Sequence, residues 1–211
     1  MQAPTPQLPA PAGLLRSISV LTALVLLGIV TASFAMRSEP AIQAEPQAPV
    51  AVFLVRHAET QASTLEARDP DLSDAGHARA AALRQLLAAT GVTHLFTSPY
   101  ERTRQMVAPL AERYELNATE YDPGQLAELA RRLRALPPGS KAVVAGHSNT
   151  TPGLAFELCG TWPGRLETDE RGGHNLPHDA YERLYLIQLP ADPDTGAGAN
   201  SMLELSLPAG D

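Results

Sequence analysis

The sequence contains a single cysteine, Cys159, among 211 residues. One cysteine excludes an internal disulfide and a cysteine-based metal cluster, and we expect neither a metal nor a cofactor. A basic excess is also lacking, because 16 Lys and Arg stand against 23 Asp and Glu, for a formal net charge of -7. A nucleic-acid-binding role therefore has no general electrostatic support. Because the net charge is negative, a phosphate site would need several arginines close together in one pocket.

Charge is absent from residues 17–36, which are rich in Leu, Val, Ala and Ile. About 20 apolar residues in a helix span the hydrocarbon core of a bilayer, so this run favours a single-pass membrane anchor. The alternative is a secretory signal that is cleaved near Ala35. A buried core helix is disfavoured, because residues 1–16 are rich in Pro, Ala and Gln and are predicted to be disordered. Residues 37–49 have the composition of a linker.

Both main interpretations place the rest of the chain outside the cytoplasm. In the first, the protein stays in the cell membrane with an extracytoplasmic, periplasmic domain. In the second, the protein is released into the periplasm after cleavage. We expect contact with the membrane through the N-terminal segment only, and the sequence does not determine the oligomeric state.

The folded domain is predicted to cover residues 50–211, where apolar strands alternate with helical segments. Residues 50–55 and 142–146 are continuously apolar, which is typical of strands buried on both faces. Helices are expected after Leu72, after Ser98 and after Asp122. This alternation predicts an α/β fold, a three-layer sandwich in which helices cover both faces of a mostly parallel sheet.

Two of the predicted strands end directly in histidine, at Arg56-His57 and at Gly146-His147. A third strand ends before Ser98, which we expect to be the N-cap of a helix that carries Arg102 in its first turn. In open α/β sheets, ligands bind at the carboxyl ends of the strands. Arg56, Arg102 and His147 are therefore predicted to bind a phosphate, helped by Ser148 and the helix N-terminus that follows it.

His57 is the candidate nucleophile of this site. A neutral imidazole attacks phosphorus through one ring nitrogen when a hydrogen bond holds the proton on the other. The product would be a phosphohistidine intermediate, which divides one difficult step into two. The pattern therefore indicates a small phosphorylated substrate.

The motifs resemble those of a known family. Residues 56–59, Arg-His-Ala-Glu, resemble the Arg-His-Gly-Glu signature of the histidine phosphatase (phosphoglycerate mutase-like) superfamily. Residues 72–80 and 98–106 resemble the starts of two of its helices, and residues 146–150 lie where the family has its second histidine. The four motifs occur in family order over roughly residues 50–190. The His-Ser-Asn-Thr sequence is more similar to small bacterial phosphatases than to glycolytic mutases.

The resemblance implies that His57 becomes phosphorylated and that Arg56, Arg102 and His147 hold the phosphate. It also implies a general acid, usually a Glu in a recognisable motif beyond the pocket arginine. This sequence has no such motif; Asp122 is the nearest placed carboxylate and Glu120 the next. Without an acid, alkoxide leaving groups depart slowly, which favours phosphohistidine-type or activated phosphoester substrates. Export of the domain favours the opposite, because protein phosphohistidine is mainly a cytoplasmic signal, and the sequence does not decide between the two.

Three functions are compatible with these residues. The first is a phosphatase that hydrolyses a phosphomonoester or a similar phosphoryl compound through phosphohistidine on His57. The second is a mutase-type phosphotransferase, which would need priming by a bisphosphorylated sugar acid. The third is a catalytically weak phosphate-binding module, although a mere binder has no need of a free imidazole at the tip of a strand.

Overall fold

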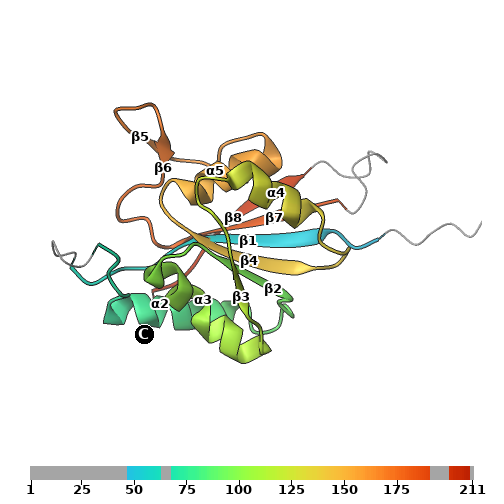
Figure 1. Ribbon diagram of the computed structural model, residues 1–211, viewed down its shortest axis with the longest axis horizontal. Coiled ribbons are helices and arrows are strands. Elements are labelled where there is room, and N and C mark those ends of the chain that lie inside the picture. The colour runs from blue at the N-terminus through green and yellow to red at the C-terminus, as the bar shows by residue number, and fades with distance from the viewer. Residues whose placement is uncertain (1–46, 63–67, 191–199, 210–211) are drawn as a thin grey trace, which may run out of the picture. The chain divides into compact units, whose positions relative to one another are not determined.

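A computed structural model of the chain describes residues 47–62, 68–190 and 200–209. These residues belong to one compact unit, Pro46–Asp211, whose start lies within the predicted linker. Strands and helices alternate along most of this unit (Figure 1). The order is β1 (Val50–Arg56), α2 (Asp74–Leu86), β2 (His94–Thr97), α3 (Glu101–Tyr114), β3 (Ala118–Glu120), α4 (Leu126–Arg134), β4 (Lys141–Gly146), α5 (Thr150–Cys159), β5 (Glu167–Thr168), β6 (His174–Asn175), β7 (Arg183–Leu189) and β8 (Ser201–Ser206).

Six strands form the main sheet, in the order β3-β2-β4-β1-β7-β8. The first four of these are parallel to one another, whereas β7 runs antiparallel to β1 and β8 antiparallel to β7. Strand β1 therefore lies inside the sheet, paired on both sides. This position explains its uninterrupted apolar sequence, because a strand covered on both faces has no side chain directed to solvent.

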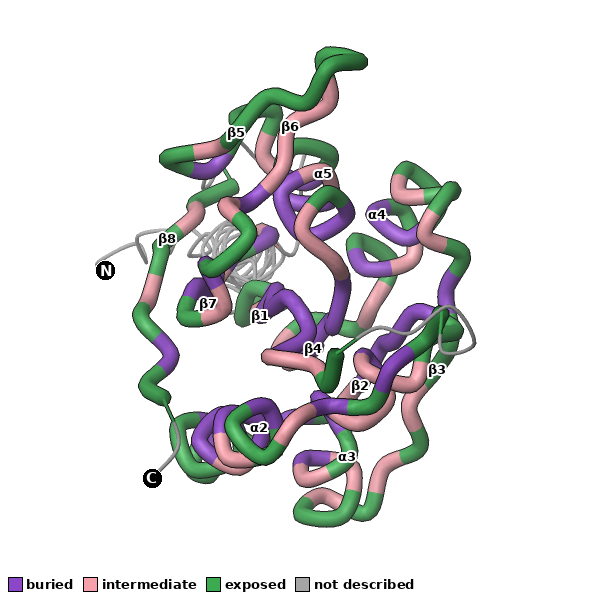
Figure 2. Tube along the Cα trace, turned by 90° about the vertical axis from the view of Figure 1, so that its left-hand side faces the viewer, coloured by how far each residue is buried: buried purple, intermediate pink, exposed green. Residues whose placement is uncertain are grey.

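Helices cover both faces of the sheet, and alternate residues of each strand enter different cores. On β1, Val52 and Leu54 pack with α4 and α5, whereas Phe53 and Val55 pack with α2 and α3. The burial pattern in Figure 2 follows this arrangement, with the buried sides of the helices turned toward the strands. The predicted three-layer α/β sandwich with a mostly parallel sheet is confirmed.

The topology brings the two histidine-bearing strand ends together. In the parallel register of β1 and β4, Arg56 lies opposite Gly146. The next backbone amide, that of His57, donates to the carbonyl of Gly146 at 2.9 Å and extends the ladder by one step. The end of β2 joins the same rim, because Thr97 pairs with Ala145. His57, His147 and the start of α3 therefore meet at one edge of the sheet.

The structure corrects the predicted start of α3. Ser98 is not its N-cap, since the helix begins at Glu101 and Tyr100 occupies the cap position without a side-chain capping bond. The residue that satisfies the amide of Glu101 is distant in sequence: Asp69 accepts from it through Oδ2 at 2.8 Å. The side chain of Ser98 is thereby available for a different role at the site.

Two further segments bear on the predictions. Residues 160–180, for which the alternating pattern predicts neither a helix nor a strand of the main sheet, contain the two-stranded hairpin of β5 and β6. The predicted anchor or signal at 17–36 lies outside the described residues. Among the residues that the structure describes, no helix combines the length and the apolar character needed to cross a membrane.

Candidate active site

His57 sits just past the end of β1 and is 8% exposed. Its Nδ1 lies 2.8 Å from the backbone carbonyl of Ala58. A carbonyl only accepts hydrogen bonds, so Nδ1 must carry the proton and Nε2 must carry the free lone pair. Because the acceptor is backbone, alanine at position 58 makes this bond as well as glycine would. The bond fixes the tautomer that a nucleophilic imidazole requires.

The surroundings of His57 also keep it uncharged. Its pKa is lowered to about 4, chiefly because burial disfavours the imidazolium, while Arg56, Arg102 and His147 add repulsion. The hydrogen bond to Ala58 opposes this shift but does not cancel it. At neutral pH the ring is therefore neutral, with a lone pair on Nε2.

His147 is the close neighbour of His57, with ring centroids 5.5 Å apart in an edge-on arrangement. Its Nε2 lies 2.8 Å from the Oγ of Ser98, and its backbone amide donates to the Oγ1 of Thr150. Burial, then Arg102 and Arg56, lower the pKa of His147 to about 4, while Asp69 acts in the opposite direction. Gly146 allows this close packing, because a Cβ there would lie 2.7 Å from Thr150 Oγ1.

An open cleft of about 580 Å³ lies over the two histidines. The described residues that line it come from the ends of β1 and β4, the starts of α3 and α5, the turn before α4, and β6. They are His57, Tyr100, Arg102, Pro123, Gly124, His147, Ser148, Asn149, Thr150 and Asn175. The structure thus brings together the predicted residues His57, Arg102, His147 and Ser148 around one space.

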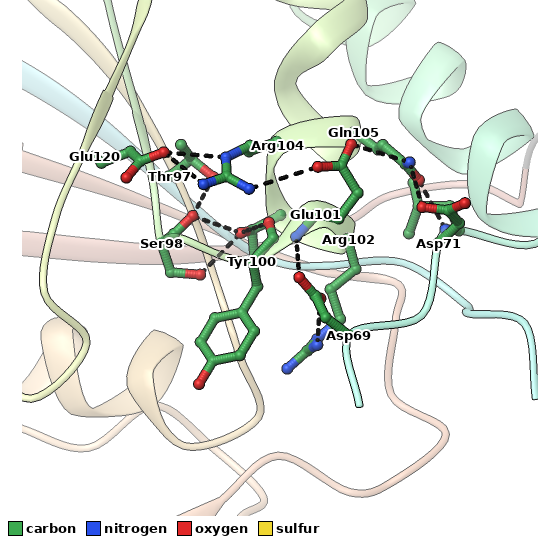
Figure 3. A network of polar contacts seen from close by, with 12 residues as sticks. Asp69, Asp71, Thr97, Ser98, Tyr100, Glu101, Arg102, Arg104, Gln105 and Glu120 are labelled. Atoms are coloured by element: carbon green, nitrogen blue, oxygen red, sulfur yellow. Dashed lines mark hydrogen bonds and ion pairs between the residues drawn. The ribbon is translucent and has the colours of Figure 1, made fainter. Parts of the chain in front are cut away.

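Arg102 is held in place by a carboxylate that the sequence analysis did not identify. Its Nη1 donates to Oδ1 of Asp69 at 2.8 Å, and its guanidinium lies over the ring of Tyr100, 4.5 Å from the centroid. Figure 3 shows Asp69 between Arg102 and the first amide of α3. The same side of α3 holds Asp71 through the side-chain amide of Gln105. Asp69 therefore orients the arginine and caps its helix at once.

Arg56 has a different environment from the one predicted. It is 6% exposed and is not among the residues that line the cleft. Its Nη1 donates to the carbonyls of Pro177 and His178 at 3.0 and 2.9 Å, and its guanidinium lies 4.4 Å from the centroid of Tyr181. Within the described part of the chain its buried Nε has no hydrogen-bond partner. Arg56 thus ties the segment after β6 to the site, and its role as a phosphate ligand stays a prediction.

The two carboxylates considered as proton donors lie elsewhere. Asp122 is exposed and accepts the amide of Gly124 through Oδ1 at 2.8 Å, while the cleft wall is formed by Pro123 and Gly124. Glu120 forms an ion pair with Arg104 at 2.7 Å. The geometry gives no support to either as the acid, because both carboxylates are committed to other partners and neither lines the cleft.

Sequence reasoning also missed residues that reach the site from distant segments. Asn175 reaches the cleft because the amide of Leu176 donates to the carbonyl of Ser148 at 2.8 Å and docks β6 beside α5. A second cleft has a volume of about 550 Å³ and shares no described lining residue with the first. No histidine is among the residues that line it, which run from Arg165 to Arg183, so the chemistry belongs to the first cleft.

Sequence and structure comparisons agree with this geometry. The family model described as histidine phosphatase superfamily (branch 1) matches residues 52–130, a span that contains His57 and Arg102. Over these residues the chain is similar to the histidine phosphatase superfamily. The second histidine of the site, His147, lies beyond the matched span at the neighbouring strand end. A search of curated proteins found no match.

Solved structures share the fold of this chain. The protein histidine phosphatase SixA complexed with tungstate is 18% identical, with a TM-score of 0.52, over 74% of this chain and 96% of that one. A Nakamurella multipartitia protein assigned as a phosphohistidine phosphatase SixA is 22% identical, with a TM-score of 0.55, over 77% and 99%. Mycobacterial hydrolase 2 is 14% identical, with a TM-score of 0.50, over 76% and 91%. At these identities the likeness shows the fold.

We predict that Asp69→Ala lowers kcat/KM for p-nitrophenyl phosphate about tenfold, equivalent to ~1.4 kcal/mol. The reason is that Arg102 loses its orienting partner and must be ordered by the substrate instead. Asp71→Ala is the matched control, because Asp71 is held by the same helix through Gln105 but does not contact the arginine. Steady-state kinetics of both variants check the prediction, and an equal effect of the two substitutions would contradict it.

Proposed function

We propose that the protein is a phosphatase that transfers the phosphoryl group of a small substrate to His57 and then hydrolyses the phosphohistidine. The observation that carries the proposal is the hydrogen bond from His57 Nδ1 to the carbonyl of Ala58, which leaves a lone pair on Nε2 at the cleft. Arg102 and His147 line the same cleft and supply positive charge and hydrogen-bond donors for the phosphoryl oxygens.

The reaction proceeds in two displacements at phosphorus. In the first, the lone pair of His57 Nε2 forms a bond to phosphorus while the bond to the leaving group breaks. In the second, water attacks phosphorus and the electron pair of the P–N bond returns to Nε2. Phosphoryl transfer depends mainly on positioning and on charge neutralisation, which the pre-oriented Arg102 provides.

The cleft favours substrates whose leaving groups do not need a carboxylate as the acid. No carboxylate is among the described residues that line it, and the carboxylates considered in the sequence lie elsewhere. Phosphohistidine and activated phosphoesters meet this requirement. The two SixA proteins that share the fold are described as a protein histidine phosphatase and as a phosphohistidine phosphatase, which supports the same substrate class.

The test is to trap the intermediate. When the protein is mixed with p-nitrophenyl phosphate and quenched in base, we expect base-stable, acid-labile phosphate on His57, together with continued turnover. His57→Ala should abolish both, because it removes the Nε2 lone pair that is proposed to attack phosphorus. His77→Ala is the matched control, since His77 is exposed on α2 and should behave like the wild type.

Three results would be informative against the proposal. Turnover that survives His57→Ala would show that another group attacks phosphorus. Binding of phosphate without turnover would indicate a phosphate-binding module. Activity seen only with phosphoglycerate and its bisphosphate primer would identify a mutase.

We also propose that the enzyme works outside the cytoplasm, tethered by residues 17–36. The uncharged run at these positions supports the proposal, because its length suits a bilayer. N-terminal sequencing of the protein from membranes tests it. An intact N-terminus in the membrane fraction is expected for an anchor. A new terminus after Ala35 in a soluble fraction would show a cleaved signal instead, and an intact soluble protein would exclude both.

A further inference from the structure

The two ring nitrogens of His147 have different surroundings. Nε2 lies 2.8 Å from the Oγ of Ser98, whose side chain is fully buried, at 0% exposure. His147 itself lines the cleft, and among the described residues its Nδ1 has no hydrogen-bond partner. Nε2 therefore faces the protein interior, and Nδ1 is the nitrogen that is available to contact an anion in the cleft.

The hydrogen bonds beyond Ser98 decide which atom carries the proton. Thr103 Oγ1 lies 2.7 Å from the carbonyl of Tyr100 and 3.0 Å from that of Ser98, and carbonyls only accept. The single hydroxyl proton of Thr103 is thus committed to the backbone. Ser98 Oγ, 2.8 Å from Thr103 Oγ1, must then donate to Thr103, so it can only accept from His147. Thr103 is also 0% exposed, so bulk water does not compete for the hydrogen bonds of either hydroxyl.

We propose that Ser98 and Thr103 are positioning residues that hold His147 as the Nε2–H tautomer, so that a phosphoryl anion binds together with a proton on Nδ1, which then passes to the leaving group. Neutral His147 in this tautomer would turn a lone pair toward the anion, which repels it. Protonation of Nδ1 converts that contact into a charge-assisted hydrogen bond. The inference rests on the proposed phosphatase function and names its missing proton donor.

The charges around His147 make this proton depend on the ligand. In the free protein its pKa is lowered to about 4 by burial, then by Arg102 and Arg56, so the ring is neutral above that pH. A dianion placed between Arg102 and the imidazoles offsets the repulsion and raises this pKa. The charged or titratable groups that face the ring are Arg56, Arg102, His57, Asp69 and Tyr100. Asp69 is the only carboxylate among them, and its two oxygens are already bonded to Arg102 and the amide of Glu101.

The proposed step balances in atoms and electrons. As His57 Nε2 bonds to phosphorus, the P–X electron pair moves to the leaving atom X, which takes the Nδ1 proton of His147 directly or through one water. His147 returns to the neutral Nε2–H tautomer that the hydroxyl pair favours. In the second displacement the same Nδ1 takes a proton from the attacking water. The imidazolium is restored when inorganic phosphate has formed.

Proton uptake on anion binding tests the inference without depending on turnover. Inorganic sulfate is the probe, because it remains a dianion with no proton of its own over the pH range of the experiment. We expect calorimetry at near-neutral pH, in buffers of different ionisation heat, to show uptake of about one proton per sulfate. We also expect affinity to fall about tenfold per pH unit above the raised pKa of His147.

Variants of the hydroxyl pair separate positioning from general stability. In Ser98→Ala, or in Thr103→Val, neutral His147 is free to place its proton on Nδ1. Uptake should then fall below about half a proton per sulfate, and sulfate affinity should depend less on pH. Thr103→Ser keeps the hydroxyl and should restore the wild-type behaviour. Thr90→Val is the matched control, because it removes a hydroxyl that donates only to the carbonyl of Leu87.

Leaving-group dependence tests the transfer of the proton. His147→Gln should reduce kcat/KM for phenyl phosphate at least about tenfold more than for p-nitrophenyl phosphate, whose leaving group needs less protonation. An equal loss on both esters would overturn the transfer.

No proton uptake by the wild type, or uptake unchanged in both Ser98→Ala and Thr103→Val, would overturn the positioning role. If the wild type hydrolyses neither ester, the proposed function fails; if it hydrolyses both while sulfate binds without a proton, only this inference fails.

Discussion

The chemistry of this protein depends on one short hydrogen bond, from His57 Nδ1 to the carbonyl of Ala58 at 2.8 Å. That bond fixes the proton on one side of the ring and the lone pair on the other. The bond exists because the chain leaves the sheet directly after Arg56, while the amide of His57 still bonds to Gly146. The buried apolar strands on either side hold the backbone in this position. A small change in the path of residues 57 and 58 would misdirect the nucleophile.

The second imidazole is held by an equally directional arrangement but with the opposite nitrogen protonated. His147 donates a hydrogen bond from Nε2 to Ser98. Ser98 donates in turn to Thr103, and Thr103 donates to the carbonyl of Tyr100. Both histidines have pKa values lowered to about 4, because burial and neighbouring arginines disfavour positive charge. At neutral pH the site therefore contains two neutral imidazoles and the oriented guanidinium of Arg102. A dianion binds more strongly when a proton is taken up with it, because protonated His147 then donates a charge-assisted hydrogen bond.

The sequence was sufficient for the sheet and for the convergence of His57, Arg102 and His147, because strand ends in a parallel sheet meet at one rim. It was not sufficient for contacts that join distant loops. Asp69 and Arg102 lie 33 residues apart, and no local pattern links them. Ser98 had the signature of a helix cap, yet tertiary contact with His147 overrode that local preference.

The contacts of Arg56 show the same limit. Its position beside the candidate nucleophile predicts a phosphate ligand, which stays a prediction, but the sequence did not indicate that its Nη1 donates to the carbonyls of Pro177 and His178. Those carbonyls come from a segment more than 100 residues away, whose position depends on the docking of β6 beside α5. Asp122 likewise followed a strand, as the sequence indicated, but its carboxylate bonds to its own turn instead of entering the cleft.

The most direct test of this account is the ring ¹⁵N chemical shifts of His57 and His147 in the free protein at neutral pH, assigned with single-histidine variants. The account predicts opposite neutral tautomers, with the proton on Nδ1 in His57 and on Nε2 in His147. A proton on Nε2 of His57 would contradict its role as the nucleophile through that nitrogen. A proton on Nδ1 of neutral His147 would contradict the arrangement of Ser98 and Thr103 on which proton uptake depends.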